Sequence, residues 1–292
     1  MVLQERKSAM TAISIVNSKM DLRVNSISQA HLNTWDICQR RYKYKFLEEL
    51  SLPEADLQSK QSLLLGANFH LLMQQREMGL DVMELAESEA KLQSWLNAFA
   101  TYPPEMIAGD RFCEHRRTLE MPLETFAISN DPNRTQTPLH HIENNDAGQG
   151  YFVLTAIYDF LILGDRRAQI LDWKTHQRAI AKEKLETSWQ TRLYLYLLAQ
   201  TTDYLPEQLS MTYWFANTAT SVVIEYSQNE HDRTDQNLKK ILNEISYAQD
   251  YLKLAMGSPE CKHCEFRDRC DRGDLSNSEF PSNISDIPEV EI

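Results

Sequence analysis

The sequence has no long apolar run. None of its hydrophobic stretches approaches the roughly 20 residues that a membrane-spanning helix needs, although 42% of its 292 residues are hydrophobic. The N-terminal stretch also lacks an apolar core followed by a small-residue cleavage site, so it does not predict a secretory signal peptide. Charged residues make up 25% of the chain, an ordinary share for a globular protein. We therefore expect a cytoplasmic protein with a sizeable core and no membrane association.

Cysteine and positive charge are also scarce. Five cysteines are too few for a disulfide framework, but Cys261, Cys264 and Cys270 fall within ten residues and suggest a metal or cluster. The net charge of −12 argues against general adhesion to nucleic acid. However, residues 1–50 carry eight Lys and Arg against five Asp and Glu, whereas residues 271–292 carry one Arg against six acids. A nucleic-acid partner therefore stays open.

The apolar patterns predict helices first, and then strands alternating with helices. The expected helices cover residues 28–46, 60–78, 81–100, 182–200 and 230–254. The expected strands cover residues 116–123, 151–163, 167–173, 209–216 and 220–226. This order predicts an α/β fold, with a helical N-terminal part, a central mixed sheet flanked by helices, and a cysteine cluster towards the C-terminus.

The same patterns predict one folded domain over residues 26–270. Residues 1–25 lack clear periodicity and are expected to form a flexible lead-in. Residues 129–150 are rich in Asn, Asp, Pro and Thr and predict a long loop. The acidic residues 271–292 are expected to be disordered.

Two acids and a lysine lie on the central pair of expected strands. Asp159 follows the run FVLTAIY, Asp172 follows QIL, and Lys174 comes two residues later. Neighbouring strands bring facing carboxylates close together, and each would have a raised pKa unless a cation lies between them. Mg²⁺ or Mn²⁺ suits such oxygen ligands, and it can activate a water and polarise a phosphoryl group. The alternative is that these residues form salt bridges at the surface.

Basic and aromatic residues alternate in the first expected helix. Arg40, Arg41, Lys43 and Lys45 surround Tyr42. The simplest interpretation is a solvated helix face, but the same pattern suits single-stranded nucleic acid, whose bases stack on rings and whose phosphates pair with cations.

These motifs together resemble the PD-(D/E)XK nuclease superfamily, and in particular its RecB-like branch. The matching pieces are an isolated strand acid, an Asp-x-Lys-Thr run, a Gln-x-x-x-Tyr helix, a Cys followed by basic and aromatic residues, and a Gly-x-x-x-His helix. In this sequence they are Asp159, Asp172-Trp173-Lys174-Thr175, Gln190 with Tyr194, Cys38-Gln39-Arg40-Arg41-Tyr42, and Gly66 with His70.

The resemblance implies a restriction-endonuclease-like fold and a metal-dependent DNA nuclease. It implies Mg²⁺ or Mn²⁺ held by His70, Asp159, Asp172 and the backbone carbonyl of Trp173, with imidazole favouring Mn²⁺. Outside the resemblance, a lone histidine such as His70 is more often structural. The implied substrate is single-stranded DNA cut by exonuclease action, in DNA repair, recombination or CRISPR-type processing.

The remaining implied roles concern residues around the metal. Lys174 serves the attacking water, and Gln190 and Tyr194 orient Lys174 or contact the DNA backbone, although a tyrosine at helical spacing is usually a core residue. The residues expected to guide the strand are Arg40, Arg41, Tyr42, Lys43 and Lys45. Glu120, on the preceding strand, is expected to assist at the same site.

The cysteine pattern resembles the iron–sulfur subset of the RecB-like nucleases. Cys261, Cys264 and Cys270 supply three ligands, and Cys38 is the expected fourth of a 4Fe–4S cluster. Zinc is the rival occupant, since spacing does not distinguish the two. We expect His263 to be a bystander and Cys113 to be a small buried hydrophobe.

Two other classes of function stay open. One is a catalytically silent nuclease-like scaffold that serves a helicase or a CRISPR adaptation complex. The other is a zinc-stapled module that binds nucleic acid without cutting it.

Overall fold

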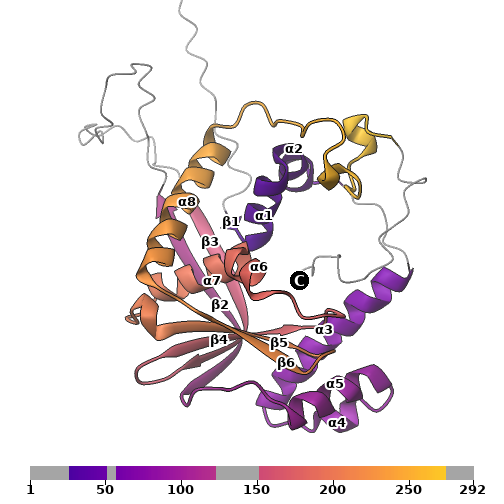
Figure 1. The fold of residues 1–292 in the computed structure, drawn as a ribbon, viewed down its shortest axis with the longest axis vertical. Helices are drawn as coiled ribbons and strands as arrows, with labels where there is room; N and C mark the ends of the chain where they lie inside the picture. Colours follow the sequence, from indigo (N-terminus) through magenta and orange to yellow (C-terminus); the bar gives the residue numbers. More distant parts are fainter. Residues whose placement is uncertain (1–25, 51–56, 123–150, 274–292) are drawn as a thin grey trace, which may run out of the picture.

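A six-stranded mixed sheet lies at the centre of the protein (Figure 1). The computed structural model describes residues 26–50, 57–122 and 151–273. The strands follow the order β1-β3-β4-β5-β6, and β2 pairs with the other edge of β3. Their bounds are β1 Ser26–Ile27, β2 Asp110–Pro122, β3 Tyr151–Leu163, β4 Ala168–Lys174, β5 Leu209–Phe215 and β6 Thr220–Glu225.

The middle of the sheet contains β4 and β5. All seven residues of β4 are buried, as expected for a central strand covered on both faces. The pairing of β4 with β5 is parallel, whereas β4 with β3 and β5 with β6 are antiparallel. A parallel pair needs a crossover connection, and here α6 (Lys182–Thr187) and α7 (Trp189–Gln200) provide it.

One face of the sheet is covered by α1 (Gln29–Ile37), α7 and α8 (Gln228–Tyr247). Helix α7 buries eight of its residues, and α8 buries an apolar stripe that includes Leu238, Ile241, Leu242 and Ile245. The spacing of that stripe explains why a helix with so many charged residues still packs on the sheet.

The opposite face is covered by α3 (Leu57–Glu77), α4 (Val82–Leu85) and α5 (Ala90–Thr101). Its core is aromatic: Trp214 of β5 contacts the rings of Phe69, Phe99 and Trp173, with centroids 5.0 to 6.4 Å apart. Helix α3 is therefore fixed against the ends of β4 and β5.

Several expected elements differ from the structure. The helix expected over residues 81–100 is divided into α4 and α5, and the helix expected over residues 230–254 ends at Tyr247. The helix expected over residues 28–46 is interrupted at Cys38, whose backbone is extended, and continues as α2 (Gln39–Tyr42) and a π-helical turn, Lys43–Leu47. The helix expected over 182–200 is divided at Ser188, because its side chain caps α7 by accepting the N–H of Thr191. The strand expected from residue 116 begins at Asp110.

The predicted α/β fold with a central mixed sheet between helices is confirmed. The predictions for residues 1–25, 129–150 and 274–292 lie outside the described residues. Within the described part of the chain, none of the helices is both long and apolar enough to cross a membrane.

Candidate active site

The two strands of the central hairpin separate at the point where their acids lie. Strands β3 and β4 pair from Leu163–Ala168 as far as Phe160–Leu171, whereas β4 stays paired with β5 up to Lys174. At the separation, Asp159 Oδ2 accepts the backbone N–H of Trp173 at 2.8 Å. The carboxylate thus satisfies a backbone donor that no longer has a strand partner on β3.

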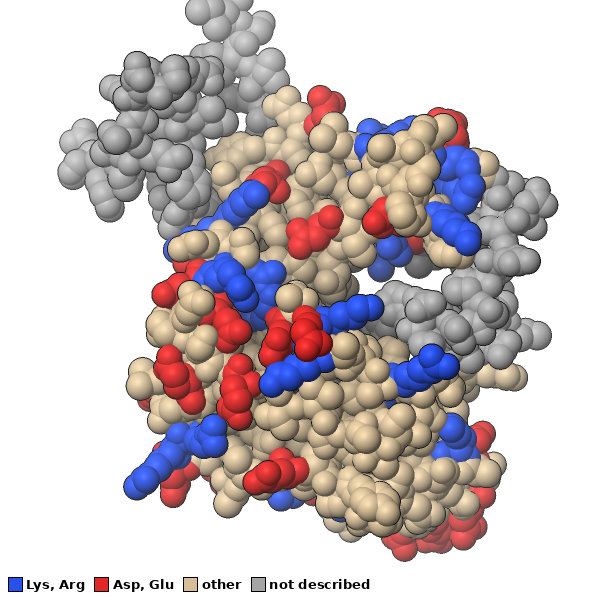
Figure 2. All heavy atoms as spheres, viewed as in Figure 1, with Lys and Arg blue, Asp and Glu red and all other residues tan. Residues whose placement is uncertain are grey.

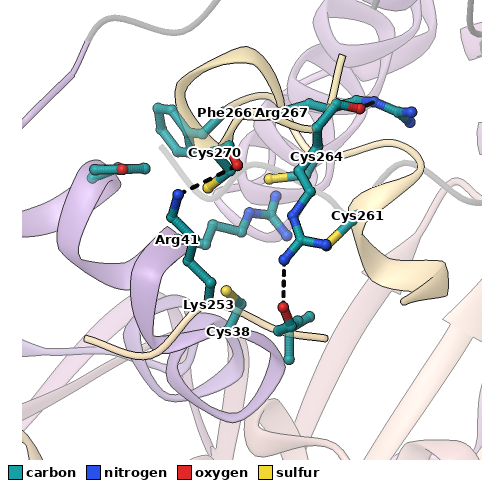
Figure 3. A pocket seen from close by; sticks show the side chains of 11 residues that line it. Cys38, Arg41, Lys253, Cys261, Cys264, Phe266, Arg267 and Cys270 are labelled. Atoms are coloured by element: carbon teal, nitrogen blue, oxygen red, sulfur yellow. Dashed lines mark hydrogen bonds between the residues drawn. The ribbon is translucent and has the colours of Figure 1, made fainter. Parts of the chain in front are cut away.

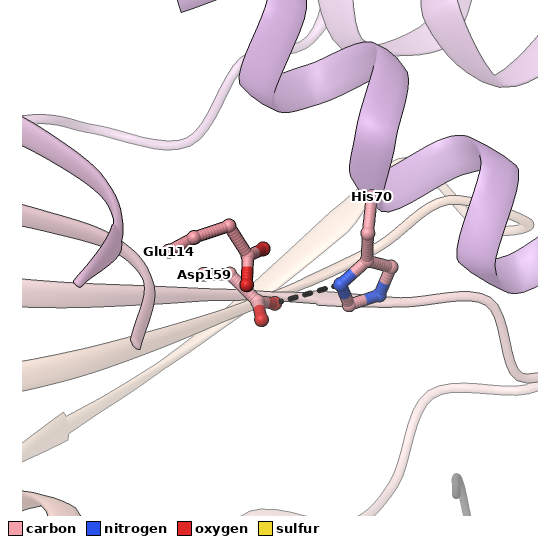
Figure 4. Close-up of side chains that lie close together, drawn as sticks. All are labelled: His70, Glu114 and Asp159. Carbon is pink, nitrogen blue, oxygen red and sulfur yellow. Dashed lines mark ion pairs between the residues drawn. The ribbon is translucent and has the colours of Figure 1, made fainter. Parts of the chain in front are cut away.

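Asp159 lies in a group of three potential metal ligands (Figure 4). His70 Nδ1 of α3 lies 3.3 Å from Asp159 Oδ2. Glu114 of β2 lies opposite, and ligand atoms of all three residues fall within 4.8 Å of one another. An imidazole and two carboxylates are suitable donors for Mn²⁺ or Mg²⁺, so the residues present fit a divalent cation.

The backbone of Glu114 explains how its side chain reaches this group. Its φ is 47°, in the left-handed region that non-glycine residues seldom adopt. Regular pairing of β2 with β3 includes Cys113–Phe160 and His115–Tyr158 but omits the position between them. Tyr158 packs on the α7 face and Phe160 on the α3 face, so the usual alternation of side chains is reversed there.

The environment keeps Asp159 ionised. Burial alone would raise its pKa, but the nearby His70, Lys174 and the N–H of Trp173 together outweigh burial and lower the pKa. The site is therefore prepared for a cation.

Gly66 lets α3 approach closely enough for His70 to reach Asp159. A Cβ atom added at Gly66 would lie 3.2 Å from Thr175 Oγ1, tighter than ordinary contact. Gly66 precedes His70 by about one helical turn. The Gly-x-x-x-His pattern thus places the close contact with Thr175 and the candidate metal ligand His70 on the same face of α3.

Asp172 and Lys174 form a second group on the α7 face. Both are buried, and Lys174 Nζ lies 2.8 Å from Asp172 Oδ2. Gln190 Nε2 donates to Asp172 Oδ1 at 2.6 Å. Asp172 does not belong to the set of three ligand atoms found among the described residues, and its expected role as a metal ligand stays a prediction.

Tyr194 is a core residue. It is 1% exposed, its ring packs edge-on against Tyr158, and its carbonyl accepts the Tyr158 hydroxyl at 3.0 Å. A ring this buried cannot contact the DNA backbone, and the alternative role of Tyr194, orienting Lys174, stays a prediction. Tyr194 instead supports β3 at the residue before Asp159.

Glu120 is also absent from the site. It pairs with Val153, six residues along β3 from Asp159. The acid that β2 contributes is Glu114, which was not predicted because the strand was expected to begin at residue 116, six residues after its start at Asp110. No local pattern marks Glu114, since the strand around it is rich in charged residues.

The basic residues of α2 and the following turn are half-buried. Tyr42 is fully buried, so its predicted stacking on bases is wrong. Arg41 forms an ion pair with Glu265 at 2.9 Å, Arg40 Nε donates to the Tyr251 carbonyl at 2.7 Å, and Lys43 lies 3.3 Å from Glu48. Burial is the main reason that the pKa of Lys45 is lowered. Contact of these four cations with DNA stays a prediction.

The four expected cluster ligands line one small cavity (Figure 3). Cys38 comes from the break before α2, and Cys261, Cys264 and Cys270 come from the segment that follows α8. Burial raises the pKa of Cys264 to about 11 and also raises that of Cys270. A metal centre bound there must displace the thiol protons.

The spacing of the sulfurs bears on which centre fits. Zinc–sulfur bonds of about 2.3 Å in a tetrahedron place sulfurs about 3.8 Å apart. Among the described residues, no three cysteines have sulfurs within 4.8 Å of one another. A bound zinc ion would therefore have to draw the thiols together, and both the cluster and zinc stay predictions for this cavity.

The two other predictions near cysteine concern His263 and Cys113. His263 is not among the residues that line this cavity, and its role as a bystander stays a prediction. Cys113 lies on β2 and packs, partly buried, against the aromatic core beneath α3.

The family described as the PD-(D/E)XK nuclease superfamily matches residues 26–271. No curated protein shows significant similarity. The chain resembles the crystal structure of SSO0001 at 16% identity, with a TM-score of 0.39, covering 84% of this chain and 85% of that one. It also resembles a proposed exonuclease from Eubacterium rectale at 11% identity, with a TM-score of 0.43, covering 82% of this chain and 86% of that one. Because the superfamily match spans most of its residues, the chain belongs to the PD-(D/E)XK nuclease superfamily.

Proposed function

We propose that the protein is a metal-dependent DNA nuclease of the RecB-like branch, a single-strand-preferring exonuclease that hydrolyses phosphodiester bonds. The observation that carries the proposal is the convergence of His70, Glu114 and Asp159 within 4.8 Å, next to the buried Asp172–Lys174 pair. Members of the superfamily use divalent metals on DNA, and this donor set fits one.

His70, Glu114 and Asp159 would hold Mg²⁺ or Mn²⁺, with Asp172 and the Trp173 carbonyl as further candidate ligands. When bound, the metal supplies an activated water and polarises the phosphoryl oxygen. The three side chains come from α3, β2 and β3, whose packing fixes their positions before substrate arrives.

Lys174 supplies a buried positive charge next to this group. Asp172 Oδ2 lies 2.8 Å from Lys174 Nζ and holds the ammonium in place. Gln190 fixes the other oxygen of Asp172, so it acts on Lys174 through that carboxylate. An ammonium held in this way positions the attacking water and stabilises negative charge that develops on the phosphoryl group.

Cys38, Cys261, Cys264 and Cys270 would hold a 4Fe–4S cluster. Their convergence on one cavity supports this proposal. Such a centre would join the N-terminal helices to the segment after α8 and contribute to folding rather than to the chemistry of cleavage.

The proposed pathway is processing of DNA in repair, recombination or CRISPR-type reactions, with a helicase or a CRISPR adaptation complex as the candidate partner. The remaining alternatives are a silent nuclease-like scaffold and a zinc-stapled binding module. The presence of Asp159, Asp172 and Lys174 together in one buried region argues against a silent scaffold.

The test is a nuclease assay with Mn²⁺ or Mg²⁺ on 5′- and 3′-labelled single strands. Lys174→Ala removes the buried ammonium, and Lys240→Ala, whose side chain is 73% exposed on α8, is the matched control. We expect wild type and Lys240→Ala to degrade DNA and Lys174→Ala to lose at least about 100-fold in rate. Equal degradation by all three proteins would contradict the catalytic assignment. Iron analysis and an absorption spectrum after anaerobic purification test the cluster, and stoichiometric zinc in a colourless protein would refute it.

A further inference from the structure

The segment that follows Lys174 carries exposed cations. Residues 175–181 lead from β4 to α6, and Arg178, Lys182 and Lys184 are all exposed. Within the described part of the chain, Arg178 and Lys184 have no acid within ion-pair distance. Lys182 makes only a pair with Glu186 at 3.8 Å, of the i, i+4 kind that contributes little.

These cations differ from those of α2 and the turn after it. There, Arg40, Arg41 and Lys43 are held by the Tyr251 carbonyl, Glu265 and Glu48. A phosphate that bound them would have to replace those partners. Phosphates can approach Arg178 and Lys184 without breaking an ion pair, so their charge is more available to a strand of DNA.

The start of the segment is fixed by the fold. Asn217 Nδ2 donates to the carbonyls of Thr175 and His176 at 2.8 and 3.0 Å. Asn217 Oδ1 in turn accepts the indole N–H of Trp95 on α5 at 3.1 Å. Ile180 packs against the core on the α7 face. The segment that carries the exposed cations is therefore held in place by hydrogen bonds from Asn217 and by packing of Ile180.

The segment also begins beside the candidate metal group. Thr175 is the residue that Gly66 approaches, and His70 follows Gly66 by one helical turn on α3. Arg178 is four residues beyond Lys174, a span of at most about 14 Å. Figure 2 shows Lys and Arg side chains, with Asp and Glu side chains among them, near the hollow in this face of the molecule.

We propose that Arg178 and Lys184, supported by Lys182, bind the phosphates of the DNA strand next to the bond that is cut. This inference rests on the proposed nuclease function and names the surface that guides the strand. Binding to phosphates carries no base information, so the contact is independent of sequence.

The test compares two double variants. Arg178→Gln with Lys184→Gln removes the proposed contacts and keeps the side chains long. Arg166→Gln with Arg233→Gln is the matched control, because both arginines are exposed, and Arg166 precedes the opposite end of β4 while Arg233 lies on α8. Fluorescence anisotropy with a labelled single-stranded oligonucleotide, with Ca²⁺ in place of the active metals, measures affinity at several salt concentrations while the strand stays intact.

Each lost phosphate contact lowers the slope of log affinity against log salt by about 0.7 for a single strand. We expect the slope of the Arg178/Lys184 variant to fall by about 1.4, which corresponds to roughly 25-fold weaker binding at 0.1 M salt. The control keeps the wild-type slope. In the nuclease assay, the Arg178/Lys184 variant shows a raised KM with kcat near the wild-type value.

A wild-type slope for the Arg178/Lys184 variant would overturn the inference, and so would an equal loss in the control, which would indicate a general effect of net charge. In both cases wild-type protein still cuts DNA, so the proposed function stands. If wild type neither binds nor cuts the strand, the proposed function fails and the inference fails with it.

Discussion

The carboxylate of Asp159 accepts the backbone N–H of Trp173 at 2.8 Å, at the point where β3 separates from β4. Asp159 thus holds the strands apart and also supplies a charge to the candidate metal group. The two roles can be separated by substitution. Asp159→Asn keeps an acceptor for Trp173 and loses the charge, whereas Asp159→Ala loses both.

We expect both Asp159 variants to lose metal binding and at least about 100-fold in nuclease rate. Only Asp159→Ala should also lose about 1 to 3 kcal/mol in the free energy of unfolding, since it leaves a buried N–H without a partner. Isothermal titration with Mn²⁺ and chemical denaturation without metal measure the two effects. Equal stability of the two variants would refute the role in strand separation.

Glu114 provides a test within a single strand. Glu114→Gln should weaken Mn²⁺ binding by about tenfold or more, because it replaces a charged ligand with a neutral one. Glu120→Gln makes the same chemical change six residues away on β2, where the side chain is outside the metal group, and should leave Mn²⁺ affinity unchanged. Titration calorimetry of both variants checks the assignment, and an equal loss in both would contradict it.

Substitution of Gly66 should affect the nuclease rate and the stability of the protein differently. Alanine is favoured over glycine in a helix by about 1 kcal/mol, but its Cβ would lie 3.2 Å from Thr175 Oγ1 and push α3 outward. We expect Gly66→Ala to reduce the nuclease rate by about tenfold, since small misplacements of a catalytic group are costly, while the melting temperature changes little. Adding Thr175→Ala should restore activity, with Thr175→Ala alone as the control. No recovery in the double variant would argue against the close contact.

The cysteine cavity predicts a difference between two otherwise similar substitutions. Cys38→Ser should abolish iron binding and lower the free energy of unfolding by about 4 kcal/mol or more, because a bound centre contributes its binding energy to folding. Cys113→Ser, which changes a cysteine outside the cavity, should keep full iron content. Iron analysis and thermal unfolding provide the measurements. Wild-type iron content in Cys38→Ser would exclude this cysteine as a ligand.

His31 predicts a pH dependence of stability. Burial and the neighbouring Lys45 lower the pKa of His31 from 6.5 to about 4. Between these values the unfolded chain binds the proton and the folded chain does not, so stability falls as pH drops from about 6.5 to about 4. The ring stacks on Phe46, and its Nδ1 accepts the N–H of Ser28. His31→Asn keeps an acceptor without titrating, and should show a smaller loss over the same interval in denaturation curves. A parallel loss in both proteins would assign the effect to other groups.

The hairpin, α7 and the mixed sheet could be predicted from the sequence because their apolar periodicity extends over whole elements. Breaks at single residues could not. Cys38 and Ser188 interrupt predicted helices because their backbones are extended in the structure. The apolar periodicity around them does not indicate this switch from helical to extended backbone.

The residues of the candidate site that belong to recognisable sequence patterns could be predicted. Asp159, Asp172 and Lys174 follow apolar runs, and His70 and Gln190 belong to spaced motifs. Glu114 depends on a left-handed backbone on β2 that no motif encodes. The sequence pattern of an aromatic side chain on a helix is the same whether the ring faces solvent or the core. The pattern therefore allows Tyr42 and Tyr194 to contact DNA, but in the structure both rings are buried in the core.

The cysteine cavity joins residue 38 to residue 270, and translation produces these residues at opposite ends of the domain. A ribosome must therefore release the hairpin, α7 and α8 before all four thiols can meet. Insertion of a cofactor at this cavity would be a late event in biosynthesis, and a chain truncated before residue 261 could not complete it. An occupied cavity would thus require that synthesis of the domain is complete.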